Sequence, residues 1–370
     1  MLRSPWFWLA LLLIAAGIAV TAALGVFVWF AWVMAVALLI LDGILLYSAY
    51  AIRSAEPPTL RKLKAVADED RIPVIYDCDL TMGCAFRDVG DGLALLYLLG
   101  EPGIDLQLVT TTYGNGPVGM TTRSARRLLN QVGREDLTVV RGADDRDDDP
   151  GQNEAAQRLV GTVNARPREL VVFCTGALTN LKHAQALDPD FFRKLRSLYL
   201  VGGVTDTLFW KDRRLEERNF SLDPEAAYQA ILTDCPTTIT LGQAGLTAVL
   251  RGPQLGALKA LDDPVSDLIV RPPPPWLPLP TLRLPANGLP MWEPVAAVAM
   301  THPEYLDRQR VHLPTTVEDL RTGRLVTDPH PSGPVRLIQG VEDYESFIKT
   351  LFAGWHHLGQ SLAADKKGRE

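Results

Sequence analysis

The sequence predicts an α/β protein with a mostly parallel, open, doubly wound sheet. Helices are expected on both faces of the sheet, and a transmembrane hairpin is expected before it. From residue 72 onward, apolar runs typical of buried strands alternate with amphipathic stretches typical of helices. This alternation favours a parallel sheet between two helical layers. Residues 6–52 are apolar almost without interruption, which is long enough for two spans of about 20 residues each.

The apolar N-terminal stretch is predicted to cross a lipid bilayer twice, with a tight turn near Gly25. Because basic residues flank it on both sides, both ends and the following domain are expected on the cytoplasmic side of a cell or inner membrane. The alternative is a cleaved signal peptide followed by one anchor. The expected organisation is a hairpin at 1–53, a linker at 54–70 and a soluble domain at 71–370.

The soluble domain is predicted to be a regular succession of strands and helices. A hairpin is expected over 310–335, with its turn at Thr322 and Gly323. The proline-rich stretch 271–285 is expected to be a long loop, either a lid or arm with a function or a rigid surface excursion. Strands are expected near 72–76, 104–115, 137–143, 169–176, 195–204 and 237–245, and helices near 121–133, 154–163, 223–234, 292–303 and 344–363, with one more beginning at 178.

Composition narrows the classes of partner. The formal net charge is −6, which gives no indication of a nucleic-acid partner. The four cysteines show no C-x-x-C spacing, so we interpret them as reduced side chains rather than as disulfides or zinc ligands. The run of acids at 144–149 is interpreted as a solvated loop.

The stretch 72–100 points most directly to chemistry. An apolar strand pattern ends at Asp77 and Asp79, and Asp88 and Asp91 follow before the next apolar run. Ligand sites of parallel α/β folds lie at the carboxyl ends of strands, so these acids are expected to gather at one site. Like charges placed together repel one another, and a metal ion would relieve that repulsion.

One interpretation of this stretch is an aspartyl phosphatase. The residues from Asp77 to Thr81 satisfy D-x-D-x-T, which is similar to the pattern of haloacid-dehalogenase-like phosphatases. Asp77 would then be the nucleophile, Asp79 the general acid and base, and Mg²⁺ the cofactor. That pattern also needs a later lysine and a distal acidic pair, and neither is convincingly placed here.

A second interpretation accounts for more of the chain. Several motifs follow one another: D-C-D and D-V-G-D-G-L-A-L within 77–95, T-T-T-Y-G-N at 110–115, T-G-A-L-T-N-L at 175–181, the glycine pair of L-V-G-G-V, E-R-N-F-S-L-D-P-E-A-A at 217–227 and W-E-P-V-A-A-V at 292–298. In this order they resemble the inosine–uridine-type nucleoside hydrolase family. The resemblance covers roughly residues 72–350, nearly the whole soluble part.

This resemblance implies hydrolysis of the N-glycosidic bond of a ribonucleoside or related ribosyl compound. It implies a Ca²⁺ ion, which binds carboxylate, carbonyl, water and sugar hydroxyl oxygens together. Asp79 would be a metal ligand and the base that activates a Ca²⁺-bound water. The other metal ligands would be Asp91, the backbone carbonyl of Thr175, and Glu293.

The resemblance also implies the residues that hold the substrate. Asn115, Glu217 and Asn219 would bind the ribose hydroxyls, and Asp77 would support the site from beside it. The expected partner is a small nucleoside-like molecule, and the family resemblance further implies a homo-oligomer.

Three positions depart from the family's pattern. Gly90 stands where the family has the first acid of an Asp pair, and Asp88 is a candidate to replace it. Trp292 and Glu293 stand where the family often has His and Asp. These departures leave a second function open, a non-catalytic membrane protein that binds a ribosyl ligand.

Overall fold

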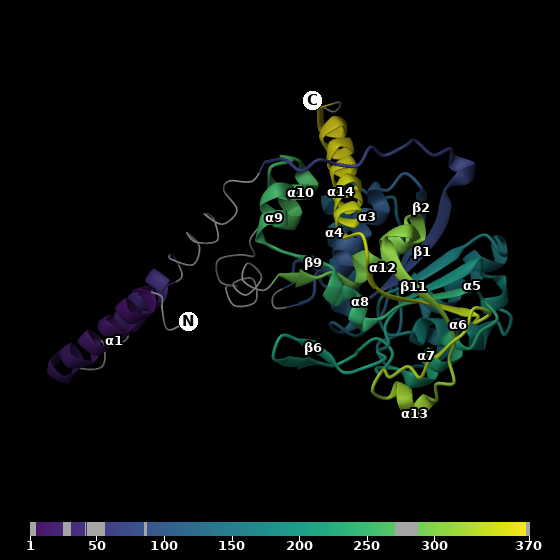
Figure 1. Cartoon of the computed structure of the whole chain (residues 1–370), viewed down its shortest axis with the longest axis horizontal. Coiled ribbons are helices and arrows are strands. Elements are labelled where there is room, and N and C mark those ends of the chain that lie inside the picture. The colour runs from purple at the N-terminus through teal and green to yellow at the C-terminus, as the bar shows by residue number, and fades with distance from the viewer. Residues whose placement is uncertain are drawn as a thin grey trace.

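A computed structural model describes residues 5–24, 31–40, 42, 56–84, 87–270 and 288–367. Within these residues the chain forms a nine-stranded sheet in the order β12-β11-β13-β8-β5-β4-β1-β2-β3. Figure 1 shows this sheet among the helices that pack on it. From β13 to β3 all neighbouring strands are parallel, and β11 and β12 pair antiparallel at one edge. The predicted mostly parallel sheet is therefore confirmed.

The strands of this sheet are β1 (Ile72–Cys78), β2 (Ile104–Thr111), β3 (Val139–Arg141), β4 (Val171–Cys174), β5 (Ser197–Val201), β8 (Thr237–Thr240), β11 (Leu306–His312), β12 (Asp328–Pro329) and β13 (Val335–Val341). The helices are α1 (Pro5–Leu24), α3 (Gly90–Gly100), α4 (Val118–Gln131), α5 (Glu154–Ala165), α6 (Thr179–Leu187), α7 (Pro224–Ile231), α8 (Gly242–Thr247), α9 (Gly252–Lys259), α10 (Pro264–Val270), α12 (Trp292–Thr301), α13 (Val317–Leu320) and α14 (Tyr344–Lys367). Two further antiparallel pairs join β6 (Leu208–Trp210) with β7 (Arg213–Leu215), and β9 (Val249–Leu250) with β10 (Leu289–Pro290).

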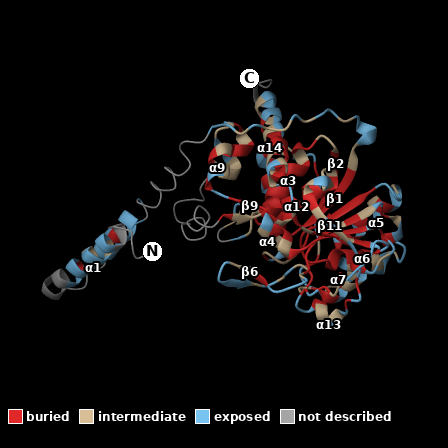
Figure 2. Ribbon diagram, in the orientation of Figure 1, coloured by how far each residue is buried: buried red, intermediate tan, exposed pale blue. Residues whose placement is uncertain are grey.

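Helices cover both faces of the sheet, as predicted. Successive side chains of a strand point to opposite faces, and Ile75 and Tyr76 accordingly enter two different hydrophobic clusters. The cluster of Tyr76 is built with α3, α4, α12 and α14, and that of Ile75 with α5, α6 and α7. Figure 2 shows the buried residues concentrated in the sheet and on the inner sides of these helices. Burial on both faces explains why the central strands read as unbroken apolar runs.

The predicted hairpin over 310–335 is wrong in its details. The outgoing strand β11 ends at His312, and the chain then forms the short helix α13 where a strand was expected. Thr316 and Asp319 start this helix, because each side chain accepts a hydrogen bond from the backbone N–H of the other, a reciprocal cap that favours helix. The main antiparallel partner of β11 is β13, which begins at Val335.

The segment predicted to be a membrane hairpin is described only in part, by α1 and by residues 31–40 and 42. Among the described residues, none of the helices combines the length and the apolar character that a bilayer span needs. Residues 25–30, 41 and 43–52 of this segment lie outside the described residues. The proline-rich stretch 271–285 lies outside the described residues.

The predicted linker contacts the domain that follows it. Arg61 donates a hydrogen bond to the hydroxyl of Tyr305, 3.1 Å away, and its guanidinium also lies within hydrogen-bond distance of the His302 ring. Both partners lie just beyond the carboxyl end of α12. His302 therefore contacts the linker at the carboxyl end of α12, whereas the candidate site lies at the amino end of that helix.

Helices α3 and α14 cross so closely that only glycine fits at their contact. A Cβ atom at Gly100 would lie 1.9 Å from the carbonyl oxygen of Gly354, whereas one at Gly161 on α5 would meet nothing within 4 Å. We predict that Gly100→Ala lowers the free energy of unfolding by about 1–3 kcal/mol, as overpacking does. Gly161→Ala should raise it by up to about 1 kcal/mol, because alanine is the better helix former.

Urea unfolding of the two variants, followed by far-UV circular dichroism, measures both effects under the same conditions. Equal stabilities for Gly100→Ala and the unchanged protein would contradict the close crossing of α3 and α14.

Candidate functional site

The candidate site lies at the carboxyl ends of the central parallel strands. Asp79 follows β1, Asn115 follows β2 and Thr175 follows β4. Asp91 is in the first turn of α3, and Glu293 is in the first turn of α12. Residues far apart in sequence therefore meet at the carboxyl ends of the parallel strands, which is where ligands bind in α/β folds.

Asn115 joins two buried acids. Its backbone N–H donates to Oδ2 of Asp79 at 2.6 Å, and its side-chain amide donates to Oδ1 of Asp79 at 3.0 Å and to Oδ2 of Asp91 at 3.3 Å. The preceding residue, Gly114, has φ 147°, and a Cβ there would lie 2.2 Å from Asp79 Oδ2. Only glycine lets this turn approach the carboxylate so closely.

Thr175 and Tyr76 hold Asp91 from the other side. The hydroxyl of Thr175 donates to Asp91 Oδ1 at 2.5 Å, and the hydroxyl of Tyr76 lies 3.3 Å from the same oxygen. The backbone carbonyl of Thr175, predicted to be a metal ligand, accepts a hydrogen bond from the side-chain amide of Asn219 at 2.9 Å. The same amide also donates to the Val201 carbonyl at 3.0 Å. Asn219 thus ties the ends of β4 and β5 together beside the acids.

Glu293 enters the site in the space that a side chain at position 90 would need. A Cβ at Gly90 would lie 1.9 Å from Glu293 Oε2 and 3.1 Å from Asp88 Oδ1. Glu293 is 7% exposed, and its Oε2 is buried without a hydrogen-bond partner among the described residues. Asp88 is half-buried and accepts a hydrogen bond from the Gly90 N–H at 2.7 Å. The longer acid on α12 and the missing side chain on α3 are thus two parts of one packing arrangement.

Burial and mutual repulsion make these acids hard to ionise. Burial, reinforced by the charge of Asp91, raises the pKa of Asp79 well above its usual value. Burial and the charge of Asp88 raise the pKa of Asp91 to about 7, against the hydrogen bond from Thr175. Burial and the charges of Asp88 and Asp91 raise the pKa of Glu293 as well. A positive ligand would lower all three pKa values.

Asp77 supports the site from the interior rather than facing a ligand. It has no exposed surface, and its Oδ1 accepts hydrogen bonds from Thr110 at 2.5 Å and from Asn180 at 2.7 Å. Burial raises the pKa of Asp77 to about 6, and these two hydrogen bonds oppose the rise. A fully enclosed carboxylate has no open path for attack on a phosphoester, which disfavours the phosphatase interpretation.

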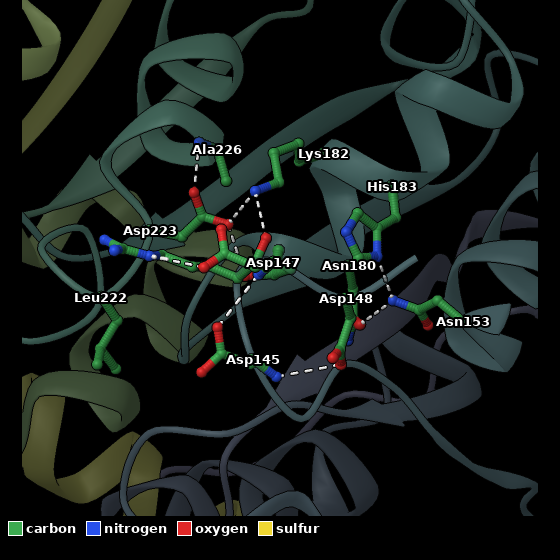
Figure 3. A network of polar contacts seen from close by, with 12 residues as sticks. Asp145, Asp147, Asp148, Asn153, Asn180, Lys182, His183, Leu222, Asp223 and Ala226 are labelled. Carbon is green, nitrogen blue, oxygen red and sulfur yellow. Dashed lines mark hydrogen bonds and ion pairs between the residues drawn. The ribbon is translucent and has the colours of Figure 1, made fainter. Parts of the chain in front are cut away.

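Asn180 links Asp77 to a polar network among the helices that cover the sheet. Figure 3 shows Asn180, Asn153, His183, Lys182 and Asp223 of this network. The carbonyl oxygen of the Asn180 side chain accepts from Asn153, whose amide also lies 2.9 Å from Nδ1 of His183. Nearby, Lys182 pairs with the fully buried Asp223 at 2.7 Å, and Asp223 caps α7 by accepting from the Ala226 N–H. Hydrogen bonds to buried partners therefore explain Asn180 of the T-G-A-L-T-N-L motif, and Lys182 just after it, without a ligand.

Glu217 is held by backbone amides rather than by the acid cluster. Its Oε1 accepts from the N–H of Phe220 at 2.9 Å and of Gly203 at 3.3 Å, and its Oε2 accepts from the N–H of Ser221 at 2.9 Å. These bonds shape the turn that presents Asn219. The ribose contact predicted for Glu217 stays a prediction.

Trp292 has a clear structural role. Its indole N–H donates to the Gly242 carbonyl at 2.6 Å, and a Cβ at Gly245 would lie 2.1 Å from its ring. The side chain therefore fixes the amino end of α12 against α8, and with it the position of Glu293. The sequence comparison of Trp292 with a family histidine did not indicate this packing role.

The donor set has the chemistry of a calcium site. Carboxylate and carbonyl oxygens are the ligands Ca²⁺ prefers, and Oε2 of Glu293 is buried with no hydrogen-bond partner within the described ranges. In the part of the chain that the structure describes, no group of three or more His, Cys, Asp or Glu side chains is placed so that it could hold a metal ion. The carboxylates of Asp79 and Asp91 instead accept hydrogen bonds from Asn115 and Thr175, so metal binding would require their side chains to turn.

The fold and these acids at the strand ends define an α/β protein with a candidate ligand site at the carboxyl ends of its parallel strands. Residues 74–349 match the family described as inosine-uridine preferring nucleoside hydrolase. The chain belongs to this family, and it is a nucleoside hydrolase-like N-glycosyl hydrolase. The family resemblance inferred from the motifs is confirmed.

Individual relatives agree with this assignment. The pyrimidine-specific ribonucleoside hydrolase RihA of Citrobacter koseri is 24% identical over 223 residues, which cover 54% of this chain and 69% of the relative. The probable uridine nucleosidase 2 of Arabidopsis thaliana is 28% identical over 185 residues, which cover 43% of this chain and 55% of that protein, so the match spans about half its length.

Solved structures show the same fold. The purine-preferring ribonucleoside hydrolase from Gardnerella vaginalis superposes with a TM-score of 0.66 at 20% identity, covering 78% of this chain and 99% of that one. The plant nucleoside hydrolase PpNRh1 gives a TM-score of 0.64 at 21% identity, covering 76% of this chain and 98% of that one.

The steric coupling between positions 90 and 293 can be measured by a double-mutant cycle. We predict that Gly90→Ala alone lowers the free energy of unfolding by about 1–3 kcal/mol, because its methyl group would overlap Glu293 Oε2. Glu293→Asp withdraws the carboxylate by one methylene. The Gly90→Ala/Glu293→Asp variant should then lose less stability than the two single variants lose together. The difference, which is the coupling energy, should be about 0.5–3 kcal/mol. If urea unfolding shows that the two single effects simply add in the double variant, positions 90 and 293 are not sterically coupled.

Proposed function

We propose that this chain hydrolyses the N-glycosidic bond of a ribonucleoside, or of a related ribosyl compound, with Asp79 as the general base. The observation that supports this most directly is the Asn115 amide, which contacts Asp79 and Asp91 together at the carboxyl ends of the strands. This arrangement offers a ribosyl group two carboxylates and a fixed amide at one place. The family of the chain supports the same reaction.

In the proposed reaction, Asp79 takes a proton from a water molecule whose oxygen forms a bond to the anomeric carbon. The bond from that carbon to the base nitrogen breaks, and the base leaves with the electron pair and gains a proton. The N–H and amide of Asn115 both donate to Asp79. They favour its ionised form, which is the form that can act as a base.

A calcium ion is part of this proposal. Asp79, Asp91, Glu293 and the Thr175 carbonyl would hold it, and it would supply positive charge and oxygen coordination for water and ribose hydroxyls. The unpartnered Oε2 of Glu293 and the raised pKa values of Asp79 and Asp91 support it.

The ribose contacts proposed for Asn115, Glu217 and Asn219 have unequal support. Asn115 faces both acids. The Asn219 amide nitrogen is bonded to two backbone carbonyls, which leaves its side-chain oxygen for a sugar hydroxyl. Glu217 would have to share oxygens that already accept three backbone N–H groups.

The membrane anchor at 6–52, the cytoplasmic location and the homo-oligomer remain proposals that rest on the sequence. The apolar run and its basic flanks support the anchor. Sedimentation of the full chain with membranes after alkaline extraction would support it, and recovery in the supernatant would contradict it.

We predict that Asp79→Asn lowers ribose release by about 10²–10⁴-fold, the usual contribution of a general base. The assay follows reducing sugar from a panel of purine and pyrimidine nucleosides. Asp147→Asn is the matched control, because Asp147 is an exposed acid whose ion pair is with Arg146. Full activity in Asp79→Asn would refute the proposed base. Ligand binding by calorimetry, with no turnover by the unchanged protein, would favour the non-catalytic alternative.

Calcium binding is predicted to depend on Glu293. Calorimetric titration of the chelator-treated protein with Ca²⁺ should show one binding event, and Ca²⁺ should raise the melting temperature. Glu293→Gln should weaken Ca²⁺ binding at least about tenfold, because a lost contact to a charged group costs about 1.5–3 kcal/mol. Asp147→Asn should bind like the unchanged protein. Undetectable Ca²⁺ binding, or equal affinity in Glu293→Gln, would count against the metal assignment.

A further inference from the structure

Two exposed arginines lie at the rim of the acidic site. Arg87, just before α3, donates to the Asn115 carbonyl at 2.7 Å. Arg218, after the β6–β7 pair, donates to the Gly114 carbonyl at 3.3 Å. Two separate segments thus place guanidinium groups on the same turn. This is the turn whose Asn115 side chain contacts Asp79 and Asp91.

Both guanidinium groups have unused hydrogen-bonding capacity. A guanidinium carries five N–H donors, and among the described residues each of these two makes a single hydrogen bond, to a backbone carbonyl, and no ion pair. Many other arginines of the chain do pair with acids: Arg71, Arg134, Arg141, Arg146, Arg166, Arg193, Arg321 and Arg324. Both side chains are exposed, and within the described part of the chain neither of them pairs with an acid.

We propose that Arg87 and Arg218 form a subsite for an anionic group carried by the ribosyl substrate, with a phosphate on the ribose as the first candidate. The planar fork of a guanidinium matches the oxygens of phosphate and carboxylate groups. Because the two arginines lie outside the acid cluster, the sugar and the anion would be bound by different groups of the protein. Ribose hydroxyls lie against the acids, and the anion lies against the arginines.

The two arginines also reduce the electrostatic repulsion between the acidic site and an anionic substrate. Asp79, Asp88, Asp91 and Glu293 would repel an anionic substrate, and the positive charges of Arg87 and Arg218 at the rim offset that repulsion. The inference rests on the proposed function and names its substrate class. The reaction needs only water, because the anionic group stays on its fragment unchanged while the bond from carbon to nitrogen is hydrolysed.

The test compares uridine, uridine 5′-monophosphate and orotidine as substrates of the full-length protein with Ca²⁺. We expect kcat/KM to be higher for the monophosphate than for uridine. Arg87→Gln and Arg218→Gln should each lower that value by about ten- to a hundredfold, the loss of one hydrogen bond to a charged group, and should lower it less for uridine. If orotidine shows this behaviour instead, the anion recognised is a carboxylate on the base.

Arg214→Gln is the matched control. Arg214 is an exposed arginine on β7 in the same segment as Arg218, and this variant should leave all three rates unchanged. If uridine is hydrolysed and the Arg87 and Arg218 variants lower the three rates equally, the anion subsite is overturned while the proposed function stands.

A binding measurement keeps the inference testable if none of the three compounds is hydrolysed. Calorimetry with ribose 5-phosphate and with ribose should show tighter binding of the phosphate. The difference should disappear in the Arg87→Gln/Arg218→Gln variant and persist in Arg214→Gln. Equal binding of the two sugars, or a difference that survives the double substitution, would overturn the anion subsite.

Discussion

The central constraint on this protein is the burial of several carboxylates at the carboxyl ends of its central strands. An isolated buried charge is strongly unfavourable, so each acid must be hydrogen-bonded, neutral or paired with a cation. The chain meets this requirement with neutral donors from different strands, chiefly Asn115 and Thr175. The glycine turn before Asn115 and the exit of β4 before Thr175 therefore position donors as well as connecting elements. The pKa values remain raised, which leaves the cluster receptive to a positive ligand.

The departures from the family's pattern at 90 and 293 are connected through space. Considered alone, Gly90 removes an acid and Glu293 only lengthens one. In the structure, the added methylene carries the Glu293 carboxylate into the volume that a side chain at 90 would fill. The site thus keeps a carboxylate at this place while drawing it from α12 instead of α3. Sequence spacing shows the loss at 90, and only packing shows how 293 relates to it.

The sequence predicted what depends on local pattern and missed what depends on partners. The apolar runs located the central strands, and the rule that acids follow such strands brought Asp79 and Asp91 to one edge. The hairpin predicted over 310–335 was wrong because the reciprocal cap between Thr316 and Asp319 starts a helix within its expected first strand. The roles of Tyr76, Asn180 and Trp292 could not be predicted, because their hydrogen bonds reach residues 15, 103 and 50 positions away.

Helix α12 shows how distant contacts set the geometry of the site. Its amino end carries Glu293 and is fixed by the hydrogen bond from Trp292 to Gly242 on α8. Just beyond its carboxyl end, His302 contacts Arg61 of the linker. A helix held at both ends has little freedom to slide, so the reach of the Glu293 side chain, rather than movement of the backbone, decides where its carboxylate lies. The linker between the apolar N-terminal segment and the sheet is thereby part of the framework that positions an acid of the site.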